Sequence, residues 1–142
     1  QESAMEPTYS VSEKFFVNRA LYKISSPKRG DVIVFKTSAS DSAALHIRRV
    51  IGLPGETVQI KDGKIYINGK VYEENGAYQD MTDGGLANSA ITLESGEYFF
   101  LGDNRNNSED SRFSDIGNIS KKYIIGKVWF TVSPKNKIGF IK

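Results

Sequence analysis

The sequence predicts an all-β fold made of coiled antiparallel β-sheets with long loops. Short runs rich in Val, Ile, Tyr and Phe recur between clusters of Gly, Asn and Asp, which is typical of strands separated by turns. Helix signals are few and short. Since 142 residues is the length of one domain, we expect residues 1–142 to form a single domain.

Eight segments carry the strand pattern, and they are spread over the whole chain. They are Lys14–Val17, Asp31–Lys36, His46–Ile51, Thr57–Lys61, Lys64–Ile67, Glu97–Leu101, Lys127–Val132 and Lys137–Ile141. Asp62-Gly63 joins two of them and supplies the positive φ angles that a tight hairpin turn requires. Asn68-Gly69 repeats this signal and predicts another short strand over Lys70–Tyr72.

The segments between the strands predict little helix. Val17–Tyr22 and Ser120–Ile124 are expected to form brief helical turns. Glu73–Ser89 is rich in Gly, Asn and Asp, so we expect a long loop there.

Charge and composition exclude several kinds of partner. Lys and Arg outnumber Asp and Glu by only 19 to 17, which is too even a balance to predict a nucleic-acid partner. The chain has no Cys, and nothing in its composition calls for a metal or a cofactor. It has no apolar run near the roughly 20 residues of a membrane span. Its abrupt start at Gln1 suggests a piece of a longer protein.

A polar loop, residues 102–112, is the strongest candidate for a functional segment. It follows the apolar run 98–101 and contains about ten polar residues in succession. A solvated loop is the simpler interpretation. The alternative is a network of hydrogen bonds and ion pairs that fixes a catalytic loop. Its members would be Asp103, Asn104, Arg105, Ser108, Asp110 and Arg112.

Four segments in order, residues 3–8, 28–35, 48–56 and 102–112, resemble the characteristic boxes of type I signal peptidases. The resemblance runs from about Ser3 to Lys127. It implies the superfold shared by signal peptidases and LexA-like self-cleaving repressors, although the full polar loop disfavours a repressor. It also implies an extracytoplasmic domain at the cell membrane, anchored by one N-terminal span that is absent from this chain, in the compact Gram-positive style.

The resemblance implies a Ser/Lys mechanism in which a serine before Met-x-Pro attacks and a lysine before Arg-Val-Ile-Gly-Leu-Pro acts as general base. Both positions are replaced here, by Ala4 and Arg48. Alanine has no nucleophilic atom, and arginine keeps its proton at any protein pH. By the same resemblance Ser108 would orient the base, and Asp110 with Arg112 would support the loop. We therefore expect no cleavage by the chain as it stands.

Three explanations of these replacements remain open. Ala4 is either an engineered replacement of a serine or natural, and the same two origins apply to Arg48. If both residues are natural, the chain is a non-catalytic signal peptidase-like assembly factor or chaperone for pilin or other exported proteins. The intact Ser108, Asp110 and Arg112 favour an engineered loss.

Two neighbouring residues are candidates to replace the missing groups. Ser3 precedes Ala4, but adjacent side chains of an extended segment point in opposite directions. His46, the only histidine, shares a strand face with Arg48. A simple strand residue remains the more economical interpretation of His46.

The resemblance also implies substrates and a membrane contact. Signal-peptide-bearing preproteins would bind as an added β-strand and place small side chains in shallow apolar pockets. Met5, Val34 and Ile51 are candidate pocket walls, with ordinary core packing as the alternative. The candidates for an apolar surface that contacts the membrane are Tyr9, Phe15, Phe16 and Val17.

Overall fold

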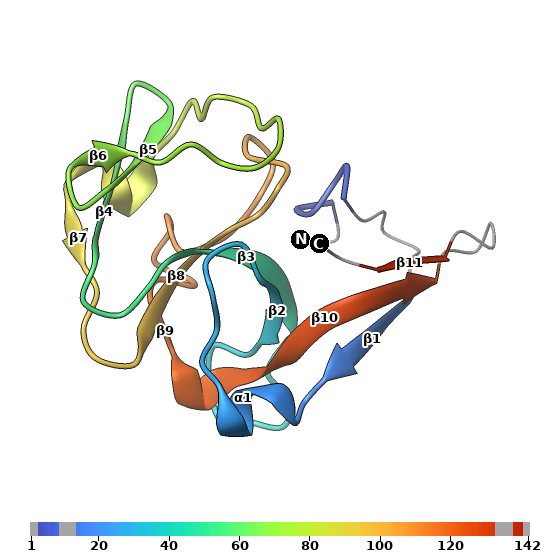
Figure 1. The fold of residues 1–142 in the computed structure, drawn as a ribbon. Coiled ribbons are helices and arrows are strands. Elements are labelled where there is room, and N and C mark those ends of the chain that lie inside the picture. The colour runs from blue at the N-terminus through green and yellow to red at the C-terminus, as the bar shows by residue number, and fades with distance from the viewer. Residues whose placement is uncertain (1–2, 9–13, 133–137, 141–142) are drawn as a thin grey trace.

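The computed structural model describes residues 3–8, 14–132 and 138–140, and it confirms the all-β class. Two antiparallel sheets contain the strands, and long loops connect them (Figure 1). The predicted membrane-contact residue Tyr9 and the side chains of Phe15 and Phe16 lie outside the described part. Within the described residues, no helix has the length and apolar character needed to cross a membrane.

The larger sheet contains seven strands in the order β1-β10-β2-β3-β8-β9, with β11 paired to β10. Their bounds are β1 Lys14–Asn18, β2 Val32–Phe35, β3 His46–Gly52, β8 Glu97–Leu101, β9 Ile119–Ser120, β10 Ile124–Val132 and β11 Ile138–Phe140. β1, β10 and β11 extend away from the rest of the molecule (Figure 1). The strand β9 was not predicted, because two residues are too few to show an alternating pattern.

The smaller sheet contains four strands in the order β6-β5-β4-β7. Their bounds are β4 Thr57–Lys61, β5 Lys64–Ile67, β6 Lys70–Val71 and β7 Ile91–Thr92. Both predicted turns are confirmed, because Asp62 and Gly63 have φ of 51° and 76°, and Asn68 and Gly69 have 51° and 81°. The short strand β7 lies beyond the predicted loop and was not predicted.

The helical segments are short, as expected, but one begins later than predicted. α1 spans Leu21–Ile24, η1 spans Gly85–Asn88 and η2 spans Lys121–Tyr123. The prediction of a helical turn from Val17 was wrong for its first residues, because Val17 and Asn18 pair with β10. The Asn18 side chain accepts hydrogen bonds from the backbone N–H groups of Ala20 and Leu21, which turns the chain into the helix.

Three apolar clusters form the core and hold the site residues between them. One lies between the two sheets and includes Ile51, Val58 and Phe99. The second lies on the face of β2 and β3 that carries Phe35 and Val50. The third joins the N-terminal segment to the sheet, and it contains Met5, Val32, Val34 and Val128, with the partly buried Val17 packed against it.

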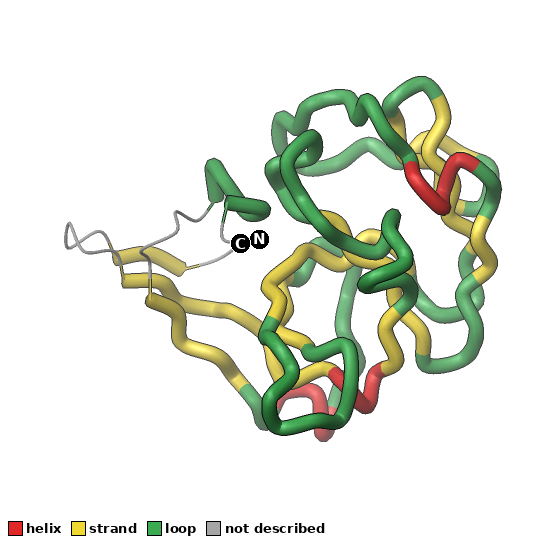
Figure 2. Tube along the Cα trace, turned by 180° about the vertical axis from the view of Figure 1, so that it is seen from behind, coloured by secondary structure: helices red, strands yellow, loops and turns green. Residues whose placement is uncertain are grey.

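The pairing register of β3 determines on which face of the sheet each of its side chains lies. Ile33 pairs with Arg48 and Val34 with Ile47, so successive residues of β3 alternate between two faces. Residues 3–8 lie beside the loops that follow β8, at the side of the molecule where β3 ends its pairing with β8 (Figure 2). The polar loop, the N-terminal segment and β3 therefore meet in one place.

Candidate active site

Ala4 lies buried in a tight turn next to the polar loop. The turn is closed by a hydrogen bond from the Glu6 N–H to the Ser3 carbonyl, 3.1 Å long. The Ala4 side chain is fully buried, and its carbonyl accepts a 2.7 Å hydrogen bond from the Asn104 N–H. The Asn104 side chain donates to the Ser3 carbonyl at 3.1 Å. Asn104 thus fixes the segment that holds the predicted nucleophile position.

Gly102 shows how closely this segment approaches the polar loop. A Cβ atom at Gly102 would lie 2.7 Å from the Ala4 carbonyl oxygen and would collide with the Ser108 Oγ. Real Cβ atoms essentially never approach so closely, so only glycine fits at this position. The predicted nucleophile position and Ser108 are therefore brought together around residue 102.

Arg48 projects from β3 and its guanidinium contacts backbone carbonyls. Its Nε donates to the Glu109 carbonyl at 2.7 Å, and its Nη1 donates to the Ile47 carbonyl at 2.7 Å. The residue is only 2% exposed. Burial lowers the pKa of Arg48 below its usual value, and the charges of Asp110 and Glu109 oppose that shift. Arginine starts from so high a value that it remains a cation here.

His46 lies two residues before Arg48 and on the same face of β3. Its ring stacks on that of Phe35, with ring centroids 5.6 Å apart. Burial lowers the pKa of His46, and the neighbouring positive charge of Arg48 lowers it further, while Glu109 opposes this. The imidazole is therefore held in its neutral form near pH 7.

Asp110 is the centre of the predicted polar network. Its buried carboxylate accepts hydrogen bonds from the Gly102 N–H at 3.0 Å and from the Ser108 hydroxyl at 2.8 Å. Arg112 donates to it through Nε at 2.8 Å and through Nη2 at 2.9 Å. A buried charge is tolerated when it is paired and hydrogen-bonded in this way. The alternative of a merely solvated loop is therefore wrong for this part of the chain.

Ser108 was predicted to orient the base at position 48. The hydrogen bond that the structure describes for its hydroxyl goes to Asp110. Arg48 contacts the next residue of the loop, at the Glu109 carbonyl. The orienting role of Ser108 therefore stays a prediction.

The other loop residues make ion pairs that reach outside the loop. Asp103 receives two hydrogen bonds from Arg49, 2.8 and 2.7 Å long, and one from the Thr8 hydroxyl. Arg105 pairs with both carboxylate oxygens of Glu74 at 2.5 and 2.6 Å. Both pairs have the two-pronged geometry that arginine and a carboxylate prefer.

Several residues of this network escaped the sequence analysis. Arg49 lies next to Arg48 in the segment 48–56, but the sequence did not indicate a role for it. Ser111 bonds to the backbone of Phe100 through both its hydroxyl and its N–H. Glu74 and Tyr78 lie in the predicted long loop, where the sequence carries no pattern that would single them out.

The three predicted pocket residues do not lie together. Met5 and Val34 belong to the same apolar cluster, next to Ala4. Ile51 is fully buried in the cluster between the two sheets. Arg49 pairs with Leu101, which belongs to the same cluster as Ile51, so Ile51 lies further along the face of β3 that carries Ile47. The pocket-wall role of Met5, Val34 and Ile51 stays a prediction.

Metal-ligating side chains do not gather at this place. Among the residues that the structure describes, no group of three or more His, Cys, Asp or Glu side chains could hold a metal ion. Asp103 and Asp110 of the polar loop are instead paired with Arg49 and Arg112.

Comparison with known proteins identifies the family. Residues 1–133 match the family model described as signal peptidase, peptidase S26. A "Probable signal peptidase I-2" of Synechocystis sp. is 31% identical over 98% of this chain, and the match spans 63% of that relative. A "Signal peptidase I" of Leptolyngbya laminosa is 38% identical over 96% of this chain and 68% of that relative. The chain thus spans about two thirds of the length of these relatives.

A solved structure agrees with this result. The crystal structure of a signal peptidase I from Enterococcus faecalis V583 superposes with a TM-score of 0.55 at 32% identity, covering 73% of this chain and 97% of that one. The fold expected from the four boxes is therefore confirmed, and the chain belongs to the peptidase S26 family of signal peptidases.

Proposed function

We propose that this chain is the extracytoplasmic domain of a signal peptidase I-type serine endopeptidase in which Ala4 and Arg48 occupy the nucleophile and base positions. In this state it binds exported preproteins without cutting them. One observation carries the proposal: Ala4 and Ser108 meet around Gly102, while Arg48 contacts the same loop at Glu109.

The chemistry of acyl transfer is missing at both positions. Ala4 offers no oxygen that could attack a carbonyl carbon, and Arg48 cannot accept a proton. Ser3 does not take over, because its hydroxyl accepts a hydrogen bond from the Asn107 side chain at 2.9 Å and its carbonyl closes the turn. His46 is stacked on Phe35 and is a simple strand residue in this account.

The edge of β3 offers a place for an extended peptide. The Val50 N–H bonds to the Asp31 carbonyl, so the backbone groups of Val50 face β2. Since backbone groups alternate along a strand, those of Ile47 face the opposite edge. The last pair between β3 and β8 is Arg49 with Leu101, so Ile47 lies past the end of β8. A peptide strand added at Ile47 would pass next to Ala4 and the Met5 and Val34 cluster.

These features define the expected partners. The apolar walls near Met5 and Val34 suit small side chains, which is the substrate class that the family resemblance implies. The partners would be signal-peptide-bearing preproteins and the outer face of the cytoplasmic membrane, reached through a single-pass N-terminal anchor. We propose no nucleic-acid partner and no cofactor for this chain.

Peptide binding by the unaltered chain tests this function. A fluorescent peptide with Ala one and three residues before the expected cut should bind, and its anisotropy should rise with protein concentration. The same peptide with Phe at both positions should bind at least about tenfold more weakly, because a bulky ring cannot enter a small pocket. Equal affinity for the two peptides, or no binding of either, would count against the proposal.

The second candidate is a non-catalytic assembly factor for pilin or other exported proteins. The burial of Arg48 favours it, since this guanidinium is 2% exposed and still reaches two backbone carbonyls. The site therefore accommodates arginine without an uncompensated buried charge. Restoring serine and lysine separates the two candidates, because only a disabled peptidase regains cleavage.

A further inference from the structure

The loop of residues 72–81, here called the cross-loop, connects the small sheet to the polar loop. It leaves β6 and runs across the molecule toward the segment that follows β8 (Figure 1). The sequence predicted only an irregular loop there. Glu74 and Tyr78 of the cross-loop contact Arg105, which lies in the middle of the polar loop.

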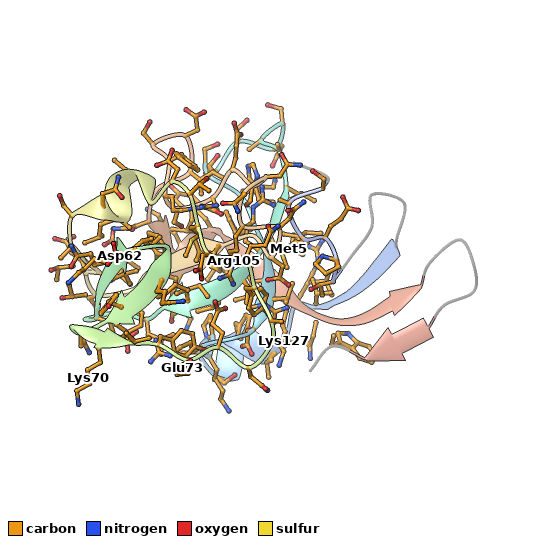
Figure 3. All side chains as sticks on the ribbon, turned by 90° about the horizontal axis from the view of Figure 1, so that it is seen from above. Met5, Asp62, Lys70, Glu73, Arg105 and Lys127 are labelled. Carbon is orange, nitrogen blue, oxygen red and sulfur yellow. The ribbon has the colours of Figure 1, made fainter. Side chains whose placement is uncertain are left out.

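Arg105 is almost completely buried, and the cross-loop supplies its counter-charge. Its side chain is 1% exposed and that of Glu74 is 12% exposed. Nη1 and Nη2 each donate to one oxygen of the Glu74 carboxylate, at 2.5 and 2.6 Å. The remaining Nε donates to the Gly102 carbonyl at 2.8 Å. The guanidinium thus links the cross-loop directly to residue 102 (Figure 3 labels Arg105 at the centre of the view).

Tyr78 adds a second contact, and it lies between two ion pairs. Its ring centroid is 4.1 Å from the Arg105 guanidinium and 6.0 Å from that of Arg49. Arg49 is the partner of Asp103. Burial raises the pKa of Tyr78, and the charge of Asp103 raises it further. The ring of Tyr78 attracts both guanidinium groups electrostatically.

Packing holds the two ends of the cross-loop, because Met81 is buried in the cluster between the two sheets and Tyr72 packs against that cluster. Between these ends, two surface cavities of about 190 and 210 Å³ border Glu74 and Tyr78. The position of this middle part therefore relies more on the ion pair and the ring contact than on packing.

The contacts continue from Arg105 to the predicted nucleophile position. The Arg105 carbonyl accepts a 2.7 Å hydrogen bond from Arg112, the partner of Asp110. The preceding residue, Asn104, donates to the Ala4 carbonyl at 2.7 Å. A displacement of Arg105 would therefore move both anchors of the polar loop.

We propose that Glu74 and Tyr78 are positioning residues that hold the polar loop, and through Asn104 the Ala4 segment, in the geometry that peptide binding requires. The part that concerns peptide binding rests on the function proposed above. The part that concerns loop geometry does not.

Hydrogen exchange measured by NMR on the chain and four variants tests the positioning role. Glu74→Gln removes the charge at nearly constant volume, and Tyr78→Leu removes the aromatic face. Tyr78→Phe keeps the ring and should behave like the unaltered chain. Asp80→Asn removes an exposed ion pair of the same loop, with Lys64, and is the matched control.

The expected result is local. Glu74→Gln and Tyr78→Leu should speed exchange of the Gly102 and Asn104 N–H groups about tenfold or more, while the β4–β5 hairpin keeps its protection. Unchanged exchange at Asn104 in both variants would overturn the proposal. An equal rise across the whole chain would also overturn it, because it would mean general destabilisation.

Peptide affinity gives the second readout. The same two variants should bind the Ala-x-Ala peptide several-fold more weakly, whereas Tyr78→Phe and Asp80→Asn should bind it normally. If the unaltered chain binds no peptide, the proposed function fails, and the exchange experiment still decides the positioning role.

Discussion

The polar loop and the two positions that it surrounds differ in what they keep of a peptidase site. In the loop, the buried Asp110 receives hydrogen bonds from Gly102, Ser108 and Arg112. At the surrounded positions, Ala4 and Arg48 lack the oxygen and the basic nitrogen that acyl transfer needs. The hydrogen-bond network of the polar loop is thus present beside two positions that lack these groups.

The hydrogen-bond network around Asp110 is built within the polar loop. The bonds of Asp110 run within residues 102–112, and none of those described involves the side chain of residue 4 or 48. Arg48 contacts the loop at the Glu109 carbonyl. Changes at the two positions should therefore alter chemistry and binding, with some loss of stability at Arg48, whereas changes at Asp110 should mainly alter stability.

The largest effect is expected from Asp110→Ala. This change leaves the buried Arg112 guanidinium without its carboxylate and the Gly102 N–H without its acceptor. The free energy of unfolding, measured with urea, should fall by about 3–5 kcal/mol. Asp80→Ala, which breaks an exposed ion pair, should cost no more than about 1 kcal/mol. Similar losses in the two variants would break the comparison.

Gly102→Ala should have the next largest effect. Its Cβ would collide with the Ser108 Oγ and crowd the Ala4 carbonyl. We expect a loss of about 1–3 kcal/mol in unfolding free energy, the usual cost of overpacking. Adding Ser108→Ala removes the colliding oxygen and should recover part of this loss. No recovery in the double variant would mean that the other close contacts of the added Cβ, 2.7 Å from the Ala4 carbonyl oxygen and from the Cβ of residue 108, account for the loss.

Arg48→Met should change peptide binding, and it should also lower the free energy of unfolding by about 1–3 kcal/mol, because the Glu109 carbonyl loses this donor. Arg48 Nη1 donates to the Ile47 carbonyl, which lies on the strand edge where an added peptide would bond. Removing this donor frees the acceptor, so affinity for the Ala-x-Ala peptide should rise roughly three- to tenfold, the value of one hydrogen bond. Titration calorimetry would measure it. Unchanged or weaker affinity would mean that the peptide does not use this edge.

The smallest effect concerns the pH dependence of stability. The folded-state pKa of His46 is lowered, by burial first and by Arg48 second. The unfolded chain therefore takes up this proton first as the pH falls, and stability should decline below about pH 6.5. His46→Gln should lose that part of the decline, which urea unfolding at pH 7.5 and 5.5 would measure. An identical decline in both proteins would contradict the lowered pKa.

The sequence predicted the fold well where local patterns decide it. The hairpin turns at Asp62-Gly63 and Asn68-Gly69 follow from positive φ angles that few residues tolerate. The bounds of β4, β5 and β8 agree with their predicted ranges. The strands β7 and β9 were missed, because two residues carry no period and their pairing is set by the rest of the fold.

The charged residues of the candidate site were predictable from the sequence, but most of the contacts that they make were not. The pairing of Asp110 with Arg112 spans two residues and followed from the resemblance. The pairing of Arg105 with Glu74 joins two loops that are far apart in sequence, so no local pattern could indicate it. Ile51 was predicted as a pocket wall with core packing as the alternative; it is fully buried between the two sheets, and its role as a pocket wall stays a prediction.

Cleavage of a preprotein with an Ala-x-Ala site, in detergent, tests the central claim most directly. The unaltered chain, Ala4→Ser, Arg48→Lys and the double variant would be compared by kcat/KM. We predict that only the double variant cuts, on the order of a thousandfold faster than either single variant, because serine and lysine act as a unit. Cleavage by Ala4→Ser alone would contradict the role given to position 48 and would indicate another base, such as His46. Peptide binding without cleavage by the double variant would contradict the peptidase account and favour the assembly factor.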